Sequence, residues 1–128
     1  MAETNTQTQP PLEQLMQMNF SFAPARIMTT ALQLRVFSHL AAGGETASDV
    51  ARAADASERG TRMLLDALVG FGLLTKGGDA YALTPHARHY LVHESPDYVG
   101  WLAESGAMMD AWAHLTDCVR TGRPFRRV

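Results

Sequence analysis

Three histidines are the first residues in this chain whose spacing suggests chemistry. His86, His89 and His93 stand at positions i, i+3 and i+7 of a predicted helix, and three imidazoles on one helical face could bind a metal ion. The outer two, however, are about 10 Å apart along the helix axis, too far for one ion to bridge. We therefore predict no metal site and a solvated histidine face. The opposite face is expected to be buried: Ala87, Tyr90 and Leu91.

The only cysteine, Cys118, has Asp117 beside it and His114 four residues before it. An activated thiolate needs a base and a group that orients the base, and residues spaced along one helix indicate packing instead. A single cysteine also excludes an internal disulfide and fits a reducing compartment. The chain contains neither G-x-G-x-x-G after a strand nor G-x-x-x-x-G-K-[ST]. We predict no catalytic and no cofactor-binding residue in it.

Length and charge limit the class of protein. The 128 residues suffice for one domain with a real core. Thirteen acidic and eleven basic residues give a net charge of -2, which argues against nucleic acid or an anionic membrane as the main partner. The sequence has neither a basic-then-apolar leader nor an apolar run long enough to span a bilayer. The expected location is the cytoplasm.

The elements that would position any site are mostly helical. Polar residues 1–11 are expected to be a flexible N-terminus. A leading helix from Leu12 is rich in methionine and phenylalanine, and these side chains suit a surface that meets a partner chain. Apolar spacing and capping residues predict further helices at these approximate ranges: 24–34 with Ser21 as cap, 36–40, 47–54, 58–71, 85–93 with Thr84 as cap, 96–105 and 106–121.

The middle of the chain has the order helix, helix, hairpin. Thr46 and Asp49 form a predicted capping box, and Ser57 caps the next helix. That helix should bury one stripe, with Met63 also in the core: Thr61, Leu64, Leu65, Leu68 and Phe71. Residues 73–76 and 80–83 flank the turn 77–79 as a hairpin. We predict a mostly α fold with a small β-hairpin, comprising a winged-helix dimerisation domain (12–95) with flanking dimerisation helices and a helical connector (96–128).

Many winged helices read DNA, so a DNA-binding transcriptional regulator is the alternative. The outward residues of the second helix would be two arginines and two carboxylates, namely Glu58, Arg59, Arg62 and Asp66. Arg62 and Asp66, four residues apart, could pair with each other. Residues 45–94 hold seven acidic and five basic residues, and Asp79 lies at the tip of the wing. This charge pattern does not suit a phosphate backbone. A stand-alone assembly module is a third possibility.

Several segments resemble one family. Residues 31–40, 61–74 and 81–85 are similar to parts of the N-terminal domain of two-domain S-adenosylmethionine-dependent O-methyltransferases, of the plant caffeate and bacterial polyketide or hydroxyneurosporene type. A glycine is common in that family where this chain has Arg35. The more specific match is the string Met109-x-x-Trp112-x-x-Leu115 followed by Gly122 and residues 124–125, which resembles the helix before the cofactor-binding domain. The resemblance covers roughly residues 12–128.

The resemblance implies a function for this segment. In that family the domain forms an intertwined homodimer through its N-terminal helices and supplies part of the pocket for a small aromatic or polyketide acceptor. Met109 matches a methionine that lines the acceptor site, and Trp112 matches its neighbour. Met16 and Phe20 are looser acceptor-pocket candidates on the leading helix. S-adenosylmethionine and the catalytic histidine belong to a Rossmann-like domain that no residue here matches, so the segment alone is expected to be inactive.

Overall fold

The structure is a computed structural model that describes residues 11–126. Its elements follow one another in this order: α2 (Leu12–Phe20), α3 (Phe22–Gln33), α4 (Val36–Ala41), α5 (Ala47–Ala54), α6 (Glu58–Gly70), β1 (Leu74–Gly77), β2 (Ala80–Leu83), α7 (Pro85–Tyr90), the 3-10 turn η1 (Gly100–Leu102), α8 (Ala107–Trp112) and α9 (Leu115–Thr121). This confirms the mostly helical fold with a small hairpin. The flexible N-terminus expected for residues 1–11 falls almost wholly outside the described residues, as do Arg127 and Val128.

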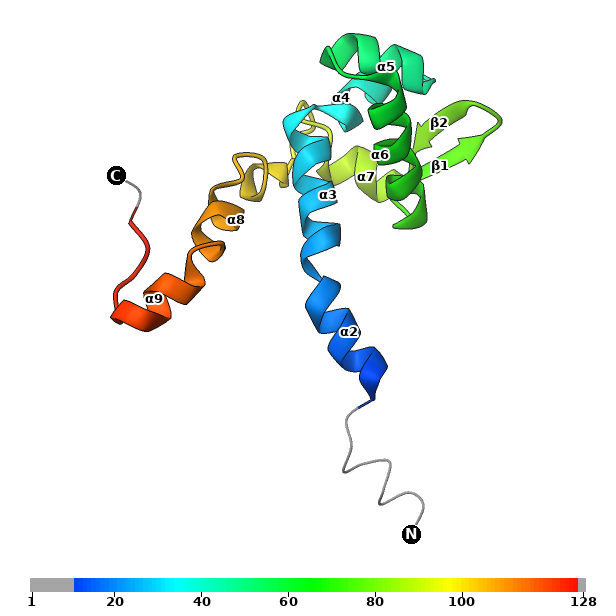
Figure 1. The fold of residues 1–128 in the computed structure, drawn as a ribbon. Helices are drawn as coiled ribbons and strands as arrows, with labels where there is room; N and C mark the ends of the chain where they lie inside the picture. Colours follow the sequence, from blue (N-terminus) through cyan, green and yellow to red (C-terminus); the bar gives the residue numbers. More distant parts are fainter. Residues whose placement is uncertain (1–10, 127–128) are drawn as a thin grey trace.

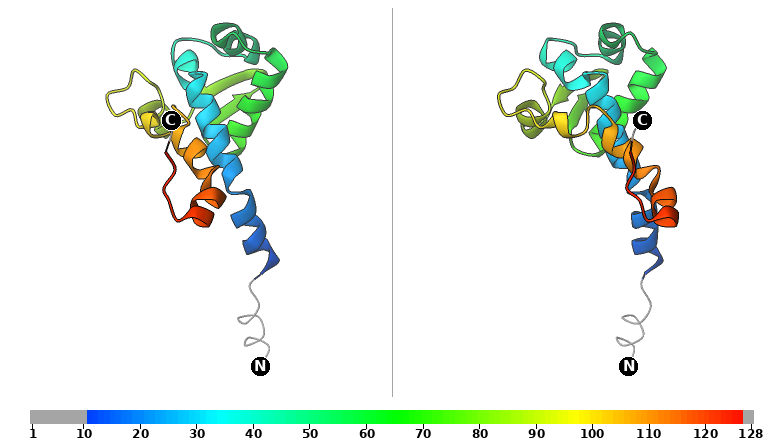
Figure 2. Two further views of the ribbon diagram at one scale, coloured as in Figure 1. Left: turned by 60° about the vertical axis from the view of Figure 1, so that its left-hand side comes forward. Right: turned by 90° about the vertical axis from the view of Figure 1, so that its left-hand side faces the viewer.

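A packed head, formed by α3, α4, α5, α6, the hairpin and α7, carries two arms (Figure 1). The first arm is α2, which continues the line of α3, and the second consists of α8 and α9; Figure 2 shows both arms leaving the head in the same general direction. The hydrophobic core lies in the head and joins the end of α3 to α4, α5, α6, the hairpin and α7. Neither α2, α8 nor α9 contains a buried residue. The arms therefore present their apolar side chains to the outside.

The helices of the head begin where the sequence predicts. The Asp49 amide donates to Thr46 Oγ1 at 3.2 Å, and Asp49 Oδ2 accepts from the Thr46 amide at 3.1 Å, which completes the capping box. Hydrogen bonds from the amides of Glu45 and Thr46 hold the pKa of Asp49 below its ordinary value. Ser57 caps α6 by accepting from the Gly60 amide. Each cap joins residues three positions apart in the sequence, so local sequence alone predicts it.

The hairpin is fastened to α6 by side chains. Its strands pair from Leu74 with Leu83 to Gly77 with Ala80, as predicted. The Tyr81 hydroxyl donates to Asp66 Oδ1 at 2.6 Å, and Lys76 Nζ donates to the same oxygen at 3.0 Å. The expected pairing of Arg62 with Asp66 is therefore wrong: Arg62 pairs with Glu58 at 2.7 Å instead. The hairpin packs against α6 and offers Asp66 two better placed donors.

This contact makes stability depend on pH. The Tyr81 hydrogen bond, with Lys76, lowers the pKa of Asp66 from 3.8, so in acid the unfolded chain takes up its proton first. The stabilisation is fully present above the unfolded pKa and is lost as the pH falls through the lowered folded value. We expect melting temperature to fall below about pH 4, and Asp66→Asn to flatten that fall. Thermal melts at several acidic pH values measure it; an equally steep fall in Asp66→Asn would contradict the assignment.

Three side chains expected in the core are exposed. Thr61, Leu65 and Leu68 are buried as predicted and Leu64 is partly buried, but Phe71 is 50% exposed. The reason is that α6 ends at Gly70, so Phe71 caps the helix and no longer continues its buried stripe. Met63, 64% exposed, and Tyr90 also face outward. Helical spacing alone did not distinguish the edge of the buried stripe from its centre.

The predicted helix 96–105 is wrong, and α7 is shorter than expected. The Val99 amide donates to Tyr90 O at 2.9 Å, so the backbone turns back to the end of α7. A helical hydrogen bond would have joined that amide to Ser95 O. The hydroxyl of Ser95 in turn donates to His89 O at 2.5 Å. Only the short turn η1 remains of the predicted helix.

The predicted helix 106–121 is divided into α8 and α9. His114 Nδ1 donates to Asp110 O at 2.8 Å, and the His114 amide turns to Ala111 O at 3.1 Å. The imidazole therefore takes the carbonyl that the amide of the same residue would use in a continuous helix. The kink between α8 and α9 follows from this exchange.

Two predicted caps and one backbone position also differ from expectation. Ser21 precedes α3, but its hydroxyl donates back to Met18 O at 2.9 Å, and Thr84 Oγ1 donates to Leu73 O at 2.9 Å. Neither side chain caps its helix. Arg35 joins α3 to α4 with φ of 56°, a left-handed conformation that glycine adopts without a Cβ penalty. None of the helices within residues 11–126 is both long and apolar enough to cross a bilayer.

Candidate functional site

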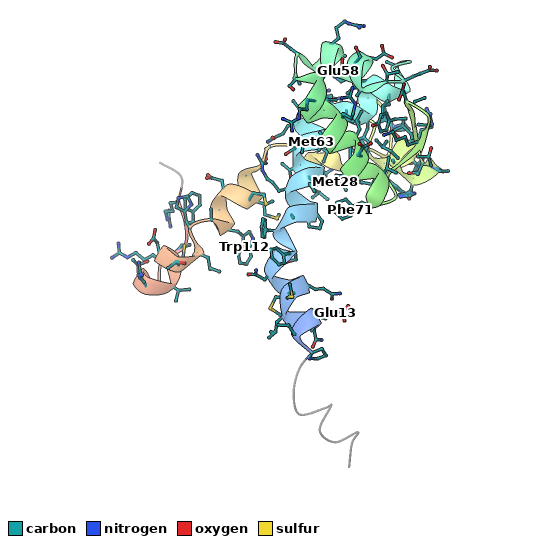
Figure 3. The ribbon with its side chains drawn as sticks, turned by 45° about the vertical axis from the view of Figure 1, so that its right-hand side comes forward. Glu13, Met28, Glu58, Met63, Phe71 and Trp112 are labelled. Carbon is teal, nitrogen blue, oxygen red and sulfur yellow. The ribbon has the colours of Figure 1, made fainter. Side chains whose placement is uncertain are left out.

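An apolar groove of about 710 Å³ lies between the end of α2, α3 and the second arm. It is lined by residues from the start of α3, from η1 and from α8: Ser21, Phe22, Pro24, Ala25, Met28, Thr29, Leu102, Ala103, Gly106, Met108, Met109 and Trp112. Figure 3 shows Trp112 in the space between α8 and the α2–α3 rod, with Met28 on the rod. Apolar concave sites of this size are typical of small-molecule binding.

The structure brings together only two of the four acceptor-pocket candidates. Met109 and Trp112 both line the groove. Met16 and Phe20 lie instead on a shallow apolar surface of α2 together with Leu12. Both are about half exposed among the residues that the structure describes. The two surfaces belong to different parts of one chain and do not form one site within it.

Sequence reasoning missed the side of the groove that α3 supplies. Phe22 and Met28 line it opposite α8, and Met108 lies beside Met109. A methionine or phenylalanine at helical spacing gives no sign of which face it shares with a distant helix. The signal that could have identified them is composition, because three of the seven methionines line this one groove.

The segment between α7 and α8 sets the position of the second wall. Gly106 takes φ of 73° at the start of α8, and a Cβ there would lie 3.1 Å from Gln33 Nε2 of α3. Glycine adopts this left-handed conformation without a Cβ penalty. Nearby, the Tyr98 hydroxyl donates to the Glu104 carboxylate. Burial, with this hydrogen bond, raises the pKa of Tyr98 above its ordinary value.

Gly100 lies against the hydroxyl end of the Tyr98 ring, and this contact can be tested. In Gly100→Ala the new Cβ would lie 2.5 Å from the ring atom Cε1. The ring must therefore move, and its hydroxyl loses the hydrogen bond to the Glu104 carboxylate. We expect a loss of about 1–3 kcal/mol of unfolding free energy and a Tyr98 pKa closer to 10.0. Denaturant unfolding and ultraviolet titration of tyrosinate measure the two effects. Gly77→Ala is the control, since a Cβ there meets nothing within 4 Å; equal losses would refute the contact.

Two of the three histidines make contacts with other residues. His89 Nε2 lies 2.9 Å from Asp97 Oδ2, and the His93 ring packs against the Tyr98 ring. In the part of the chain that the structure describes, no group of three or more His, Cys, Asp or Glu residues is placed to hold a metal ion. Cys118 is a free, partly buried thiol on α9, and His114 stacks on Phe125. Among the contacts described for residues 11–126, none pairs the Cys118 thiol with His114 as a nucleophile and its base.

The outward face of α6 does not carry the charge that DNA recognition needs. Glu58 pairs with Arg62, and Asp66 pairs with Lys76 from the hairpin. Met63 and Phe71 are exposed on the same helix and its cap (Figure 3). Ion pairs neutralise two of the cations available to phosphates, and apolar side chains occupy part of the remaining face. No observation here favours the DNA-binding alternative.

Known proteins contain similar segments. In mouse, acetylserotonin O-methyltransferase is 38% identical over 119 residues, covering 85% of this chain and 30% of that protein. The tetracenomycin polyketide synthesis 8-O-methyl transferase TcmO of Streptomyces glaucescens is 34% identical, covering 84% and 33%. The structure of human N-acetylserotonin methyltransferase in complex with SAM superposes with a TM-score of 0.77 at 32% identity, covering 90% and 36%. The chain thus spans about a third of the length of these relatives.

A family model gives the assignment directly. The model of the O-methyltransferase dimerisation domain matches residues 16–93, which include the second half of α2 and every element from α3 to α7. The match covers more than half of the chain, and the similarity to the relatives extends it toward α8 and α9. The chain therefore belongs to the family of O-methyltransferase dimerisation domains.

Proposed function

We propose that this chain is the dimerisation and acceptor-pocket segment of an S-adenosylmethionine-dependent O-methyltransferase. The whole enzyme would methylate a hydroxyl of a small aromatic or polyketide acceptor in the cytoplasm, as a homodimer. The observation that carries the proposal is the apolar groove with Met109 and Trp112 in its wall. Relatives named for methylating acetylserotonin, a tetracenomycin polyketide and a hydroxynaphthoate support this class of acceptor.

The two apolar surfaces suggest how two copies would combine. Helix α2 projects beyond the head (Figure 1), and its surface of Leu12, Met16 and Phe20 is about half or more exposed among the described residues. Apolar side chains gathered on one exposed helix are typical of interfaces. We propose that α2 of each protomer packs against its partner and brings Met16 and Phe20 toward the partner's groove. The head, with α5, α6 and the hairpin as a winged-helix unit, would hold the arms in place.

The methyl donor does not fit the groove. S-adenosylmethionine carries a charged sulfonium and an amino acid group, which need charged or hydrogen-bonding partners when buried. None of the residues lining the groove is ionisable. We therefore expect the donor and the proton-accepting base to lie outside this segment, which contributes orientation of the acceptor alone. Calorimetric titration of S-adenosylmethionine into these 128 residues should give no binding heat, and tight binding would overturn this expectation.

Sedimentation velocity over a range of protein concentrations tests the dimer. We expect a species of twice the chain mass that dissociates on dilution. Gln17 lies on the same α2 surface as Met16, so cysteines introduced there should yield a covalent dimer if the two α2 surfaces approach each other. A species of single-chain mass at every concentration would contradict the proposal.

A further inference from the structure

The side chain of His114 makes contacts on both sides of the break between α8 and α9. Its Nδ1 atom donates to Asp110 O of α8 at 2.8 Å. Its ring stacks on the ring of Phe125, with the ring centroids 4.4 Å apart and the ring planes 18° from parallel. One residue at the junction of two helices therefore holds a carbonyl of the first helix and a side chain of the segment that follows the second.

Nothing in the covalent structure requires the helix to break at this point. Residues 107–121 contain neither proline nor glycine, and apolar spacing alone predicts one helix. The His114 amide, displaced from Asp110 O by Nδ1, donates to Ala111 O at 3.1 Å, so both donors of this residue are satisfied. His114 accordingly has ψ of 11°, against about −42° in an α-helix, and a new helix begins at Leu115.

The ring contact holds the chain that follows α9. Gly122 ends α9 with φ of 70°, and beyond it the chain turns back along the second arm (Figure 2). The 7 residues of α9 rise about 10 Å, and the chain from Gly122 to Phe125 spans at most about 11 Å. Because these lengths match, Phe125 returns to His114 when the segment lies extended beside α9. Phe125 is accordingly partly buried.

We infer that His114 is a positioning residue that keeps α8 and α9 at an angle and directs the chain beyond α9. The inference goes beyond the proposed function, because His114 does not line the groove. Helix α8 carries Met109 and Trp112 of the proposed acceptor site, so the angle at His114 sets how the following chain leaves that site. The contact requires one tautomer of the neutral imidazole, with the proton on Nδ1 and none on Nε2.

The tautomer of His114 can be measured directly. In the chain with ¹⁵N-labelled histidine, the nitrogen chemical shifts distinguish a protonated ring nitrogen from an unprotonated one. At about pH 8, where an ordinary histidine is neutral, we expect Nδ1 of His114 to carry the proton. A proton on Nε2 would overturn the inference, since Nδ1 would then have nothing to donate to Asp110 O.

A matched pair of variants tests whether Nδ1 breaks the helix. In His114→Asn the side-chain amide nitrogen takes the place of Nδ1, counted in bonds from Cα, whereas in His114→Gln it lies one bond further out. Spin labels on cysteines introduced at Ala107 and Val119, in a chain with Cys118→Ser, report the distance across the junction. Both sites are exposed, and in one straight helix they would lie about 18 Å apart along the axis.

We expect this distance to separate the two variants. His114→Asn should keep the distance of the unsubstituted chain, and His114→Gln should lengthen it toward that of a straight helix. The labelled chain is diluted into excess unlabelled chain, so that only distances within one chain contribute. An unchanged distance in His114→Gln, or an equal lengthening in both variants, would overturn the role of Nδ1. Neither α8 nor α9 contains a buried residue, so both variants should have the melting temperature of the unsubstituted chain.

Phe125→Ala tests the second contact of His114. The substitution removes the ring stack and leaves Nδ1 in place, so the distance between the labels on α8 and α9 should not change. Labels at Ala107 and Arg126 should give a narrow distance distribution in the unsubstituted chain and a broad one in Phe125→Ala. Phe125→Tyr keeps an aromatic ring and should restore the narrow distribution. Equal widths in all three chains would show that the stack does not direct the chain beyond α9. Sedimentation tests the dimer separately, so either result leaves the proposed function intact.

Discussion

Replacing Met16 with glutamate is expected to raise the dissociation constant of the proposed dimer roughly a thousandfold. Met16 lies in the apolar stripe of α2 and is 49% exposed in a single chain. A charge in the desolvated centre of an interface costs about 2 kcal/mol or more. A twofold-symmetric interface contains the change twice, which gives about 4 kcal/mol, or roughly three powers of ten. Sedimentation velocity across a dilution series measures the constant.

Gln14→Glu is the control for this substitution. Gln14 lies about 160° around α2 from Met16, on the face away from Leu12 and Phe20. The variant adds the same charge to the same helix, so it should dissociate less than tenfold more readily than the unsubstituted chain. If Gln14→Glu and Met16→Glu weakened the dimer equally, charge repulsion between subunits would explain the loss, and the apolar stripe would not be the interface.

Phe37→Ala is expected to destabilise the chain by about 3–5 kcal/mol. Phe37 is the largest of the fully buried side chains and is 1% exposed, within the core that joins α3, α4, α5 and α6. The substitution removes the buried apolar surface of the ring and leaves a cavity that the close-packed neighbours fill only in part. Domains of this kind have about 5–15 kcal/mol of stability in total, so the variant loses a large share. Urea unfolding at one fixed protein concentration measures the change.

Phe71→Ala removes the same ring from an exposed position. Phe71 is 50% exposed beyond the end of α6, so we expect a loss below about 1 kcal/mol. The comparison separates burial from any general effect of losing an aromatic ring. A loss in Phe71→Ala as large as that in Phe37→Ala would mean that Phe71 is covered, either in the core or in the dimer. Dilution would distinguish these two cases, because only the second depends on protein concentration.

Features built from neighbouring residues were predictable. Thr46 and Asp49 cap α5, Ser57 caps α6, and the glycine-containing turn 77–79 joins the two strands, because each contact closes between residues a few positions apart. The mostly helical class followed from the spacing of apolar residues. The predicted family also followed from sequence strings, and the family model matches residues 16–93.

Features that depend on distant residues were not predictable from local patterns. The helix expected at 96–105 is absent because the Val99 amide turns to Tyr90 O, and Asp66 leaves Arg62 for Tyr81 and Lys76. Propensity describes what a segment does alone, whereas a partner from another element can form the hydrogen bond that the local pattern assigns elsewhere.

The sequence by itself determined the capped helices, the hairpin and the family, since these depend on contacts within short stretches of chain. Only the tertiary structure decided where the groove lies. It lies where α3, η1 and α8 come together, which brings Met28 opposite Met109 and Trp112, while Met16 and Phe20 lie on a separate surface of α2. Residues so far apart in sequence meet through the packing of the head and the turns that lead out of it, and no periodicity records that meeting.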